Sequence, residues 1–263
     1  MKEIALMGHI VAGFPNFETS LEAAFGICLG GAKYLEVQFP FSDPNADGIT
    51  ITNACAVALE NGFNTDLGFE FITQLQQKLA HSGITTKLLI MTYGNILFCY
   101  GIESFLKKAK LCGVYGLIVP DLSWGNDEKL FAKARKMGLE NIALIAPQTK
   151  PKRIEKLSNA SGAFVYVVAR NGITGDTTQI NESLMQYICV VKAHCQKPIA
   201  LGFGIQSKEQ IDALRGVVPI AIVGSAFVRY IDKICKKSEN ANGEIANKLC
   251  AFTQGLWGES KES

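Results

Sequence analysis

The chain has 263 residues, of which 48% are hydrophobic, enough for one well-packed α/β domain without disulfide or metal cross-links. Its 26 basic and 24 acidic residues give a formal net charge of +2, and no long basic run occurs, which disfavours nucleic acid as a partner. The eight cysteines are scattered, with no C-x-x-C pair and no Cys/His cluster at zinc spacing. This pattern predicts reduced thiols and no metal site.

The apolar run 4–12 near the N-terminus has the composition of a short signal peptide. However, it contains His9 and leads into Gly13-Phe14-Pro15 without a small-residue cleavage site, so we interpret it as a first buried strand. No other stretch is long and apolar enough to span a bilayer. We therefore expect a cytoplasmic protein without membrane contact.

Short apolar runs alternate with amphipathic segments along the chain. The runs predict strands at 5–12, 33–39, 87–92, 115–120, 141–146, 163–168, 198–202 and 219–223. The segments predict helices at 18–29, 67–79, 102–111, 127–137, 151–159, 182–194 and 208–214, with a polar loop at 236–243 before a last helix at 244–256. Strict alternation of strand and helix predicts a parallel sheet with right-handed crossovers.

A repeat of about thirty residues fits a closed (β/α)₈ barrel, in one domain spanning residues 1–263, better than an open doubly wound sheet. A dinucleotide-binding open sheet would place G-x-G-x-x-G after its first strand. This chain has Ala12-Gly13-Phe14-Pro15 there, which favours the barrel. The open sheet remains the structural alternative.

Candidate catalytic carboxylates cluster at the second expected strand. Strand alternation points Glu36 and Gln38 to the same side, the barrel interior, where a carboxylate is costly unless it is used or paired. The loop 41–48 adds Asp43 and Asp47, which are turn or helix-cap residues or catalysts. Asp47 is the better catalytic candidate because it lies farther along a loop that can fold over the barrel mouth.

Glycine-containing turns follow the last three expected strands, at 171–175, 202–205 and 224–226. Barrel enzymes bind phosphate groups at these late strands, where backbone N–H groups and a helix N-terminus face the anion. We therefore predict a phosphate site, with Ser225 adding a hydroxyl donor. Tyr166 is either an ordinary strand tyrosine or a hydroxyl at the barrel mouth, and Arg170 contacts the phosphate or braces the following loop.

Together these residues closely resemble the family of tryptophan synthase α subunits. The pieces that carry the resemblance are Pro40-Phe41-Ser42-Asp43-Pro44 with Ala46-Asp47-Gly48, Met91-Thr92-Tyr93-Gly94-Asn95, Gly116-Leu117-Ile118-Val119-Pro120-Asp121-Leu122, Gly172-Ile173-Thr174-Gly175, Gly202-Phe203-Gly204-Ile205 and Val223-Gly224-Ser225-Ala226. P-F-S-D-P followed by A-D-G is specific to the family, whereas other phosphate-binding barrels share the glycine turns.

The resemblance implies retro-aldol cleavage of indole-3-glycerol phosphate to indole and glyceraldehyde 3-phosphate, without a metal or cofactor in this chain. It implies that Glu36 is the acid–base residue, that Asp47 holds the indole N–H and that Tyr166 lends a hydroxyl. The phosphate contacts that it implies are Gly175, Gly204, Gly224 and Ser225, under a closing loop that carries Arg170 and Thr174.

The resemblance also implies a partner, a β subunit that binds pyridoxal phosphate (PLP) and receives indole within an α₂β₂ heterotetramer. Residues implied to face that partner are Asp43, Pro44, Asn95 and Asp121. The extra helix that usually precedes the first strand is expected to be missing. Gln38 replaces a usual glycine beside Glu36, where it is expected to hydrogen-bond Glu36 or narrow the pocket, and His9 takes a usually aromatic position.

The pattern is consistent with three functions to different degrees. The first is a lyase that a β partner stimulates. The second is a catalytically weakened α-type subunit that acts mainly as an allosteric activator of the β subunit. The third is a different phosphate-handling barrel isomerase or synthase, which gives no reason for P-F-S-D-P followed by A-D-G. The presence of Glu36, Asp47 and all three glycine turns favours the lyase.

Overall fold

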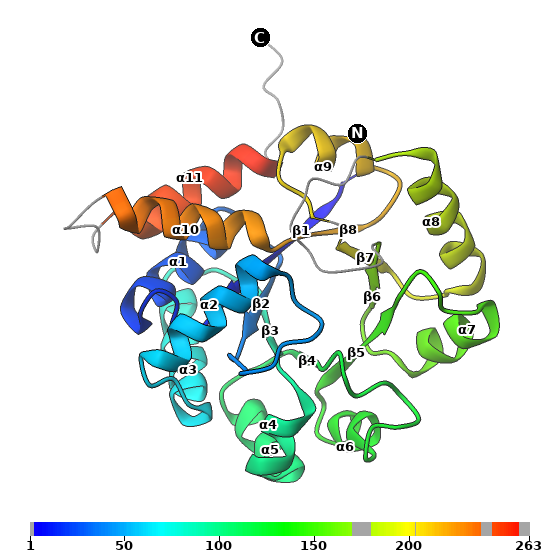
Figure 1. The fold of residues 1–263 in the computed structure, drawn as a ribbon, viewed down its shortest axis with the longest axis horizontal. Coiled ribbons are helices and arrows are strands. Elements are labelled where there is room, and N and C mark those ends of the chain that lie inside the picture. The colour runs from blue at the N-terminus through cyan, green and yellow to red at the C-terminus, as the bar shows by residue number, and fades with distance from the viewer. Residues whose placement is uncertain (1–2, 170–179, 203, 238–243, 258–263) are drawn as a thin grey trace.

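A computed structural model describes residues 3–169, 180–202, 204–237 and 244–257, which contain a closed barrel of eight parallel strands (Figure 1). The strands are β1 (Ala5–Val11), β2 (Tyr34–Gln38), β3 (Lys87–Met91), β4 (Gly116–Ile118), β5 (Glu140–Ile145), β6 (Val165–Val168), β7 (Ile199–Gly202) and β8 (Ile220–Val223). Each pairs with the next in chain order, and β8 pairs with β1 to close the ring. The predicted (β/α)₈ barrel is confirmed, and β1 is the first described element.

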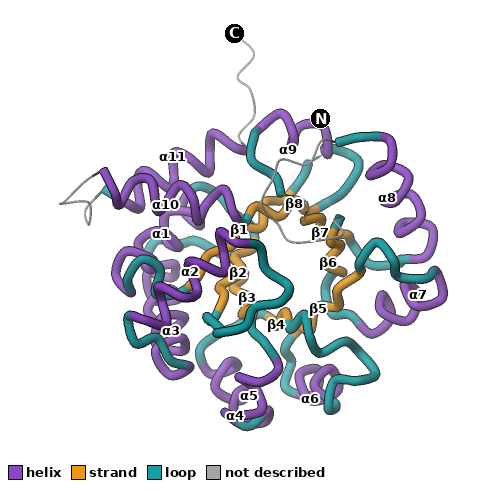
Figure 2. The backbone as a smooth tube through the Cα atoms, in the orientation of Figure 1, coloured by secondary structure: helices purple, strands orange, loops and turns teal. Residues whose placement is uncertain are grey.

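Helices surround the ring of strands (Figure 2). They are α1 (Phe17–Leu29), α2 (Ile49–Glu60), α3 (Thr65–His81), α4 (Gly94–Tyr100), α5 (Ile102–Leu111), α6 (Leu130–Lys136), α7 (Pro151–Ala160), α8 (Glu182–His194), α9 (Lys208–Leu214), α10 (Ser225–Lys237) and α11 (Ile245–Trp257). Within the described ranges, none of them combines the length and the apolar character needed to cross a bilayer.

The sequence pattern missed α2, α4 and α10. Helix α2 is rich in β-branched residues and lacks a clear polar face, and α4 is only seven residues long, set apart from α5 by Gly101 at φ +84°. The loop predicted at 236–243 begins too early, because α10 extends through Lys237. The rest of that predicted loop, 238–243, lies outside the described residues.

Helix α6 begins three residues later than the predicted start at Asp127. Glu128 and Lys129 have φ angles of +47° and +63°, which are incompatible with a right-handed helix. The Asp127 carboxylate instead accepts hydrogen bonds from the backbone N–H groups of Gly125 and Phe131, at 3.1 and 2.9 Å. The residue that the pattern assigned to the helix therefore caps it from outside.

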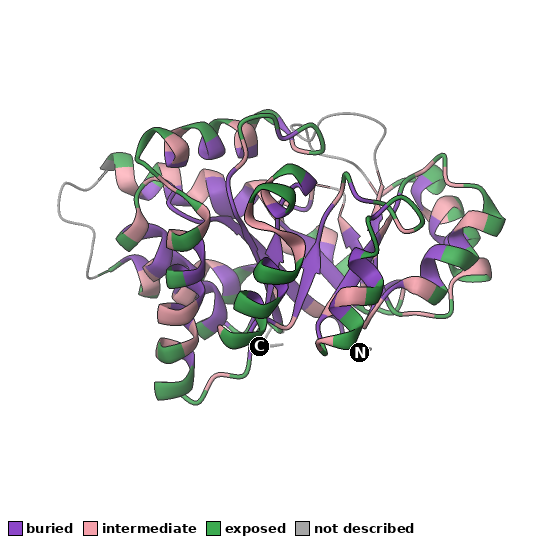
Figure 3. Cartoon of the chain, turned by 90° about the horizontal axis from the view of Figure 1, so that it is seen from below, coloured by how far each residue is buried: buried purple, intermediate pink, exposed green. Residues whose placement is uncertain are grey.

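In Figure 3 the strands are mostly buried, whereas the helices alternate between buried and exposed positions. Strand alternation divides the core into an outer part, between sheet and helices, and an inner part within the barrel. The inner part comprises Met7, Tyr34, Leu89, Met91, Tyr93, Ile118, Ile142, Phe164, Ala200, Ile220 and Ile222. Toward the C-terminal ends of β1 and β2 the inward positions become polar, with His9, Glu36 and Gln38 all buried. This change of lining marks the end of the barrel where chemistry can take place.

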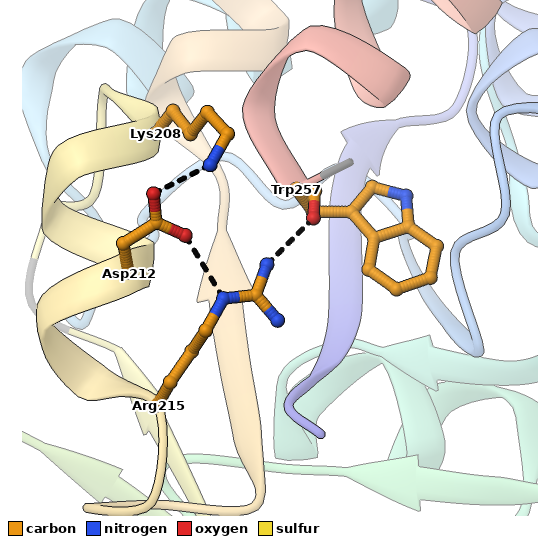
Figure 4. Close-up of polar contacts among 4 residues, drawn as sticks. All are labelled: Lys208, Asp212, Arg215 and Trp257. Carbon is orange, nitrogen blue, oxygen red and sulfur yellow. Dashed lines mark hydrogen bonds and ion pairs between the residues drawn. The ribbon is translucent and has the colours of Figure 1, made fainter. Parts of the chain in front are cut away.

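The last helix, α11, is fixed against both α9 and α1. Arg215, just after α9, donates to the Trp257 carbonyl at 2.8 Å, while Asp212 accepts from Arg215 and Lys208 (Figure 4). The Trp257 indole in turn donates to the Gly30 carbonyl at the end of α1, at 2.9 Å. Through these bonds α11, the last helix of the chain, is connected to the end of α9 and to the end of α1, the first helix.

Gly26 allows α1 and α11 to approach closely, because a Cβ atom there would lie 2.3 Å from the Ala246 carbonyl oxygen and 2.8 Å from Leu249 Cβ. We expect Gly26→Ala to lower the free energy of unfolding by about 1–2 kcal/mol, since overpacking outweighs the roughly 1 kcal/mol helix preference of alanine. Gly255→Ala in α11 is the matched control, because no atom lies within 4 Å of its added Cβ. Urea unfolding should give opposite signs for the two variants, and equal effects would exclude a packing role for Gly26.

Candidate active site

A cavity of about 120 Å³ lies at the C-terminal ends of the strands. Its lining includes six of the residues predicted from sequence: Glu36, Asp47, Tyr166, Gly204, Gly224 and Ser225. A second cavity of about 550 Å³, toward β4 and β5, shares Ala46, Pro120, Leu144 and Val168 with it, so the two adjoin. Arg170, Thr174 and Gly175 lie outside the described residues.

Glu36 lies at the base of this site beside His9. The two residues are direct neighbours in the register of β1 and β2, and both side chains point into the barrel. His9 Nδ1 lies 3.3 Å from Glu36 Oε2, and the residues are only 4% and 2% exposed. Burial is the largest single influence on the pKa of His9 and lowers it, but the charge of Glu36, its side-chain interaction with His9 and the charge of Asp47 together raise the pKa above the ordinary value.

Asp47 is held over the cavity by two donors to the same oxygen. Gln38 Nε2 donates to Asp47 Oδ2 at 2.6 Å, and the Tyr93 hydroxyl donates to it at 2.9 Å. Burial raises the pKa of Asp47, although the charge of His9 and these two hydrogen bonds oppose that shift. The expected hydrogen bond from Gln38 to Glu36 is not the one formed, because the Gln38 amide reaches Asp47 and the Cys55 thiol.

Tyr166 completes the polar wall on the opposite side of the barrel. Gly202 makes room for it, since a Cβ on Gly202 would lie 3.2 Å from the Tyr166 hydroxyl oxygen. Burial raises the pKa of Tyr166 well above its ordinary value, and the charges of Glu36 and Asp47 add to the shift. Its hydroxyl is therefore protonated at neutral pH and can donate a hydrogen bond.

The late strands supply glycine turns and a helix N-terminus at the cavity. Gly204 has φ +81°, a conformation that favours glycine, and Gly224 directly precedes Ser225, the first residue of α10. The first N–H groups of a helix have no partner within that helix and attract anions. Among the described residues, no group of three or more His, Cys, Asp or Glu side chains is arranged to hold a metal ion.

Comparisons with known proteins agree with this geometry. A family model described as "Tryptophan synthase alpha chain" matches residues 1–256. The tryptophan synthase alpha chain of Helicobacter hepaticus is 50% identical over 96% of this chain and 95% of its own length. That of Methanocaldococcus jannaschii is 38% identical over 94% and 84%. The chain belongs to the tryptophan synthase alpha chain family.

Solved structures of this family have the same fold. A Mycobacterium tuberculosis tryptophan synthase chain superposes with a TM-score of 0.83 at 29% identity, covering 97% of this chain and 91% of that one. A mutant tryptophan synthase alpha-subunit from Pyrococcus furiosus gives a TM-score of 0.84 at 28% identity, covering 97% and 98%. The likeness spans the whole barrel rather than one motif.

The residues expected at the subunit interface lie in the segments that follow β2, β3 and β4, with Asn95 in the first turn of α4. Asp43, Asn95 and Asp121 are exposed, whereas Pro44 is buried in the isolated chain. Both Asp121 carboxylate oxygens accept the Gly94 N–H, at 2.9 and 3.0 Å, at the start of α4. Asp121 therefore has a structural role within this chain, whatever it contacts outside it.

Two residues of the site carried a weaker signal in the sequence. Tyr93 appeared only within a quoted motif, although its place two residues past the end of β3 puts it at the catalytic face. His9 departs from the family pattern, and its contact with Glu36 follows only from the strand register.

Proposed function

We propose that this chain is the α subunit of a tryptophan synthase and cleaves indole-3-glycerol phosphate to indole and glyceraldehyde 3-phosphate. It is thus a carbon–carbon lyase of tryptophan biosynthesis. The observation that supports this most directly is one cavity lined by two carboxylates, Glu36 and Asp47, together with the glycine turns that follow β7 and β8. No observation favours a catalytically weakened subunit.

Glu36 is the acid–base residue of this proposal. Its carboxyl group protonates the indole carbon that bears the side chain, and its carboxylate then removes the proton of the glycerol hydroxyl as the carbon–carbon bond breaks. One group serves both steps because each step leaves it in the form that the next requires. Its burial inside the barrel keeps water away from this exchange.

Asp47 holds the indole N–H while positive charge develops on the ring. Both described hydrogen bonds to its carboxylate use Oδ2, and in this proposal the other oxygen, Oδ1, accepts the indole N–H. Because Gln38 and Tyr93 fix the carboxylate before substrate arrives, little reorganisation is needed as charge forms. Tyr166 donates its hydroxyl hydrogen bond nearby.

The phosphate group binds at the late strands, at Gly204, Gly224, Ser225 and Gly175. The N-terminus of α10, which begins at Ser225, supplies backbone N–H groups for this anion. In this proposal the segment with Arg170 and Thr174 closes over the bound substrate and excludes water.

This chain takes no cofactor of its own for the reaction, and its partner is a tryptophan synthase β subunit that binds PLP. Asp43, Pro44, Asn95 and Asp121 are proposed to face that subunit in an α₂β₂ heterotetramer. Coupling between the two sites is reciprocal, because binding free energies are linked in both directions. The complex is proposed to work in the cytoplasm.

The test is release of indole from indole-3-glycerol phosphate by the purified chain, with and without its cognate β subunit. We expect release that increases when the β subunit is added. Stimulation of the β subunit without any indole release would instead identify a regulatory subunit and exclude the lyase.

A further inference from the structure

We propose that His9 is a positioning residue that holds the Glu36 carboxyl group and shares a proton with it, so that a His9–Glu36 pair replaces a lone carboxylate as the acid–base unit. This inference rests on the proposed function, which assigns the acid–base role to Glu36. It adds a second ionisable group to the reaction.

The strand register brings the two side chains together. Because β1 and β2 run parallel with His9 opposite Glu36, both residues project inward at the same level of the barrel. The 3.3 Å separation of His9 Nδ1 and Glu36 Oε2 is that of an ion pair, and Oε2 accepts no hydrogen bond in the described part of the chain. On the other side of the imidazole, Gly224 has no side chain, and a Cβ there would lie 3.6 Å from His9 Cβ. The imidazole is thus packed between β2 and β8 with Nδ1 toward Glu36.

The second ring nitrogen, Nε2, is buried and has no hydrogen-bond partner in the described part of the chain. A buried polar atom without a partner costs free energy, so its presence at the wall of a cavity points to a role during catalysis. If His9 only filled space here, an apolar ring of similar size would be more stable at this position, because it would bury no polar atom without a partner.

The charges around His9 favour a proton on the pair. Glu36 on β2 and Asp47 on the following loop are its electrostatic partners, while Tyr166 on β6 faces the same two carboxylates. The neighbouring residues Ile222 on β8 and Gly224 just after it carry no charge. With the pKa of His9 raised by Glu36, the pair retains a proton to higher pH than an isolated buried histidine would.

This sharing matters for the first step of the cleavage. Protonating the indole carbon requires that the acid–base unit holds a proton, and His9 Nδ1 keeps one within reach of the Glu36 carboxylate as pH rises. When the pair loses that proton, the step stops. The alkaline limb of the pH–kcat profile therefore reports the pair and not Glu36 alone.

Two variants distinguish the positioning role of the His9 side chain from its sharing of a proton with Glu36. His9→Phe keeps a ring of similar size but removes the donor, and His9→Asn keeps an N–H donor that does not titrate. In the complex with the β subunit, we expect His9→Phe to lower kcat at least about tenfold while KM changes by less than about threefold. His9→Asn should recover most of kcat at low pH. In both variants the alkaline limb should move about one pH unit or more toward lower pH.

The matched control is His81→Asn, which makes the same chemical change at an exposed histidine whose Nδ1 contacts only the Gln77 carbonyl among the bonds described. It should leave kcat and the pH profile unchanged. A wild-type kcat and alkaline limb in His9→Phe would overturn the proposal.

A second readout does not depend on activity or on the folding of a His9 variant. Nitrogen-15 NMR of the three histidine rings in the purified chain should show His9 titrating above 6.5, its ordinary value, and at lower pH in the Glu36→Gln variant. Unchanged titration of His9 in that variant would refute the pair. Absence of indole release from the wild-type complex would instead refute the proposed function, and this titration would still decide whether the pair exists.

Discussion

Glu36→Gln is expected to reduce indole release at least about 1,000-fold, because general acid–base catalysis by one side chain contributes about 10²–10⁴-fold. Glutamine has nearly the same size and shape but cannot exchange a proton at neutral pH. The phosphate turns lie on the late strands and not on β2, so glyceraldehyde 3-phosphate should bind almost as tightly as in the wild type. Steady-state kinetics and calorimetry measure the two effects separately.

Glu155→Gln is the matched control for this substitution. Glu155 also contacts a histidine, with its Oε1 2.9 Å from His194 Nδ1, but it lies on the outer surface of α7. We expect its removal to leave both cleavage and phosphate binding unchanged. Substantial residual cleavage by Glu36→Gln would remove Glu36 from its assigned role.

Gly204→Asp is expected to weaken binding of glyceraldehyde 3-phosphate about 100-fold or more, since like charges placed together cost several kcal/mol and each 1.4 kcal/mol is tenfold. The new carboxylate would lie at the cavity where the phosphate is proposed to bind. Backbone strain is expected to lower the stability of this variant as well, because Gly204 has φ +81°.

Gly83→Asp is the control that introduces the same backbone strain without placing a charge at the cavity. Gly83 also has a positive φ, +65°, and a Cβ there would meet no atom within 4 Å. It lies between α3 and β3, at the N-terminal end of the barrel. This variant should lose a similar amount of stability and retain full ligand affinity. Equal ligand binding by Gly204→Asp and the wild type would place the phosphate elsewhere.

The barrel could be predicted from the sequence because its signals are local. Each expected strand overlaps an observed one, since a strand buried on both faces needs a continuous apolar run. The failures were also local: α2 lacks a clear amphipathic period, α4 is only seven residues long, and the hydrophobicity pattern does not reflect the positive φ angles before α6. Tertiary packing, and not the periodicity of the sequence, decides whether such segments form helices and where they begin.

The candidate site could be predicted as a set of residues but not as a set of contacts. Placing Glu36, Tyr166 and the glycine turns at the catalytic face requires only strand alternation and the order of the strands. The hydrogen bond from Gln38 to Asp47 required the actual path of the loop after β2, which alternation does not describe.

The sequence by itself therefore determined the fold, the family and the face of the barrel that carries the chemistry, because apolar periodicity and short motifs are properties of neighbouring residues. Only the tertiary structure decided which polar groups pair there. His9 and Glu36 are 27 positions apart in the chain, and the register of β1 with β2 brings their side chains to 3.3 Å. Strand register depends on the closure of the whole barrel, so no local stretch of sequence encodes that contact.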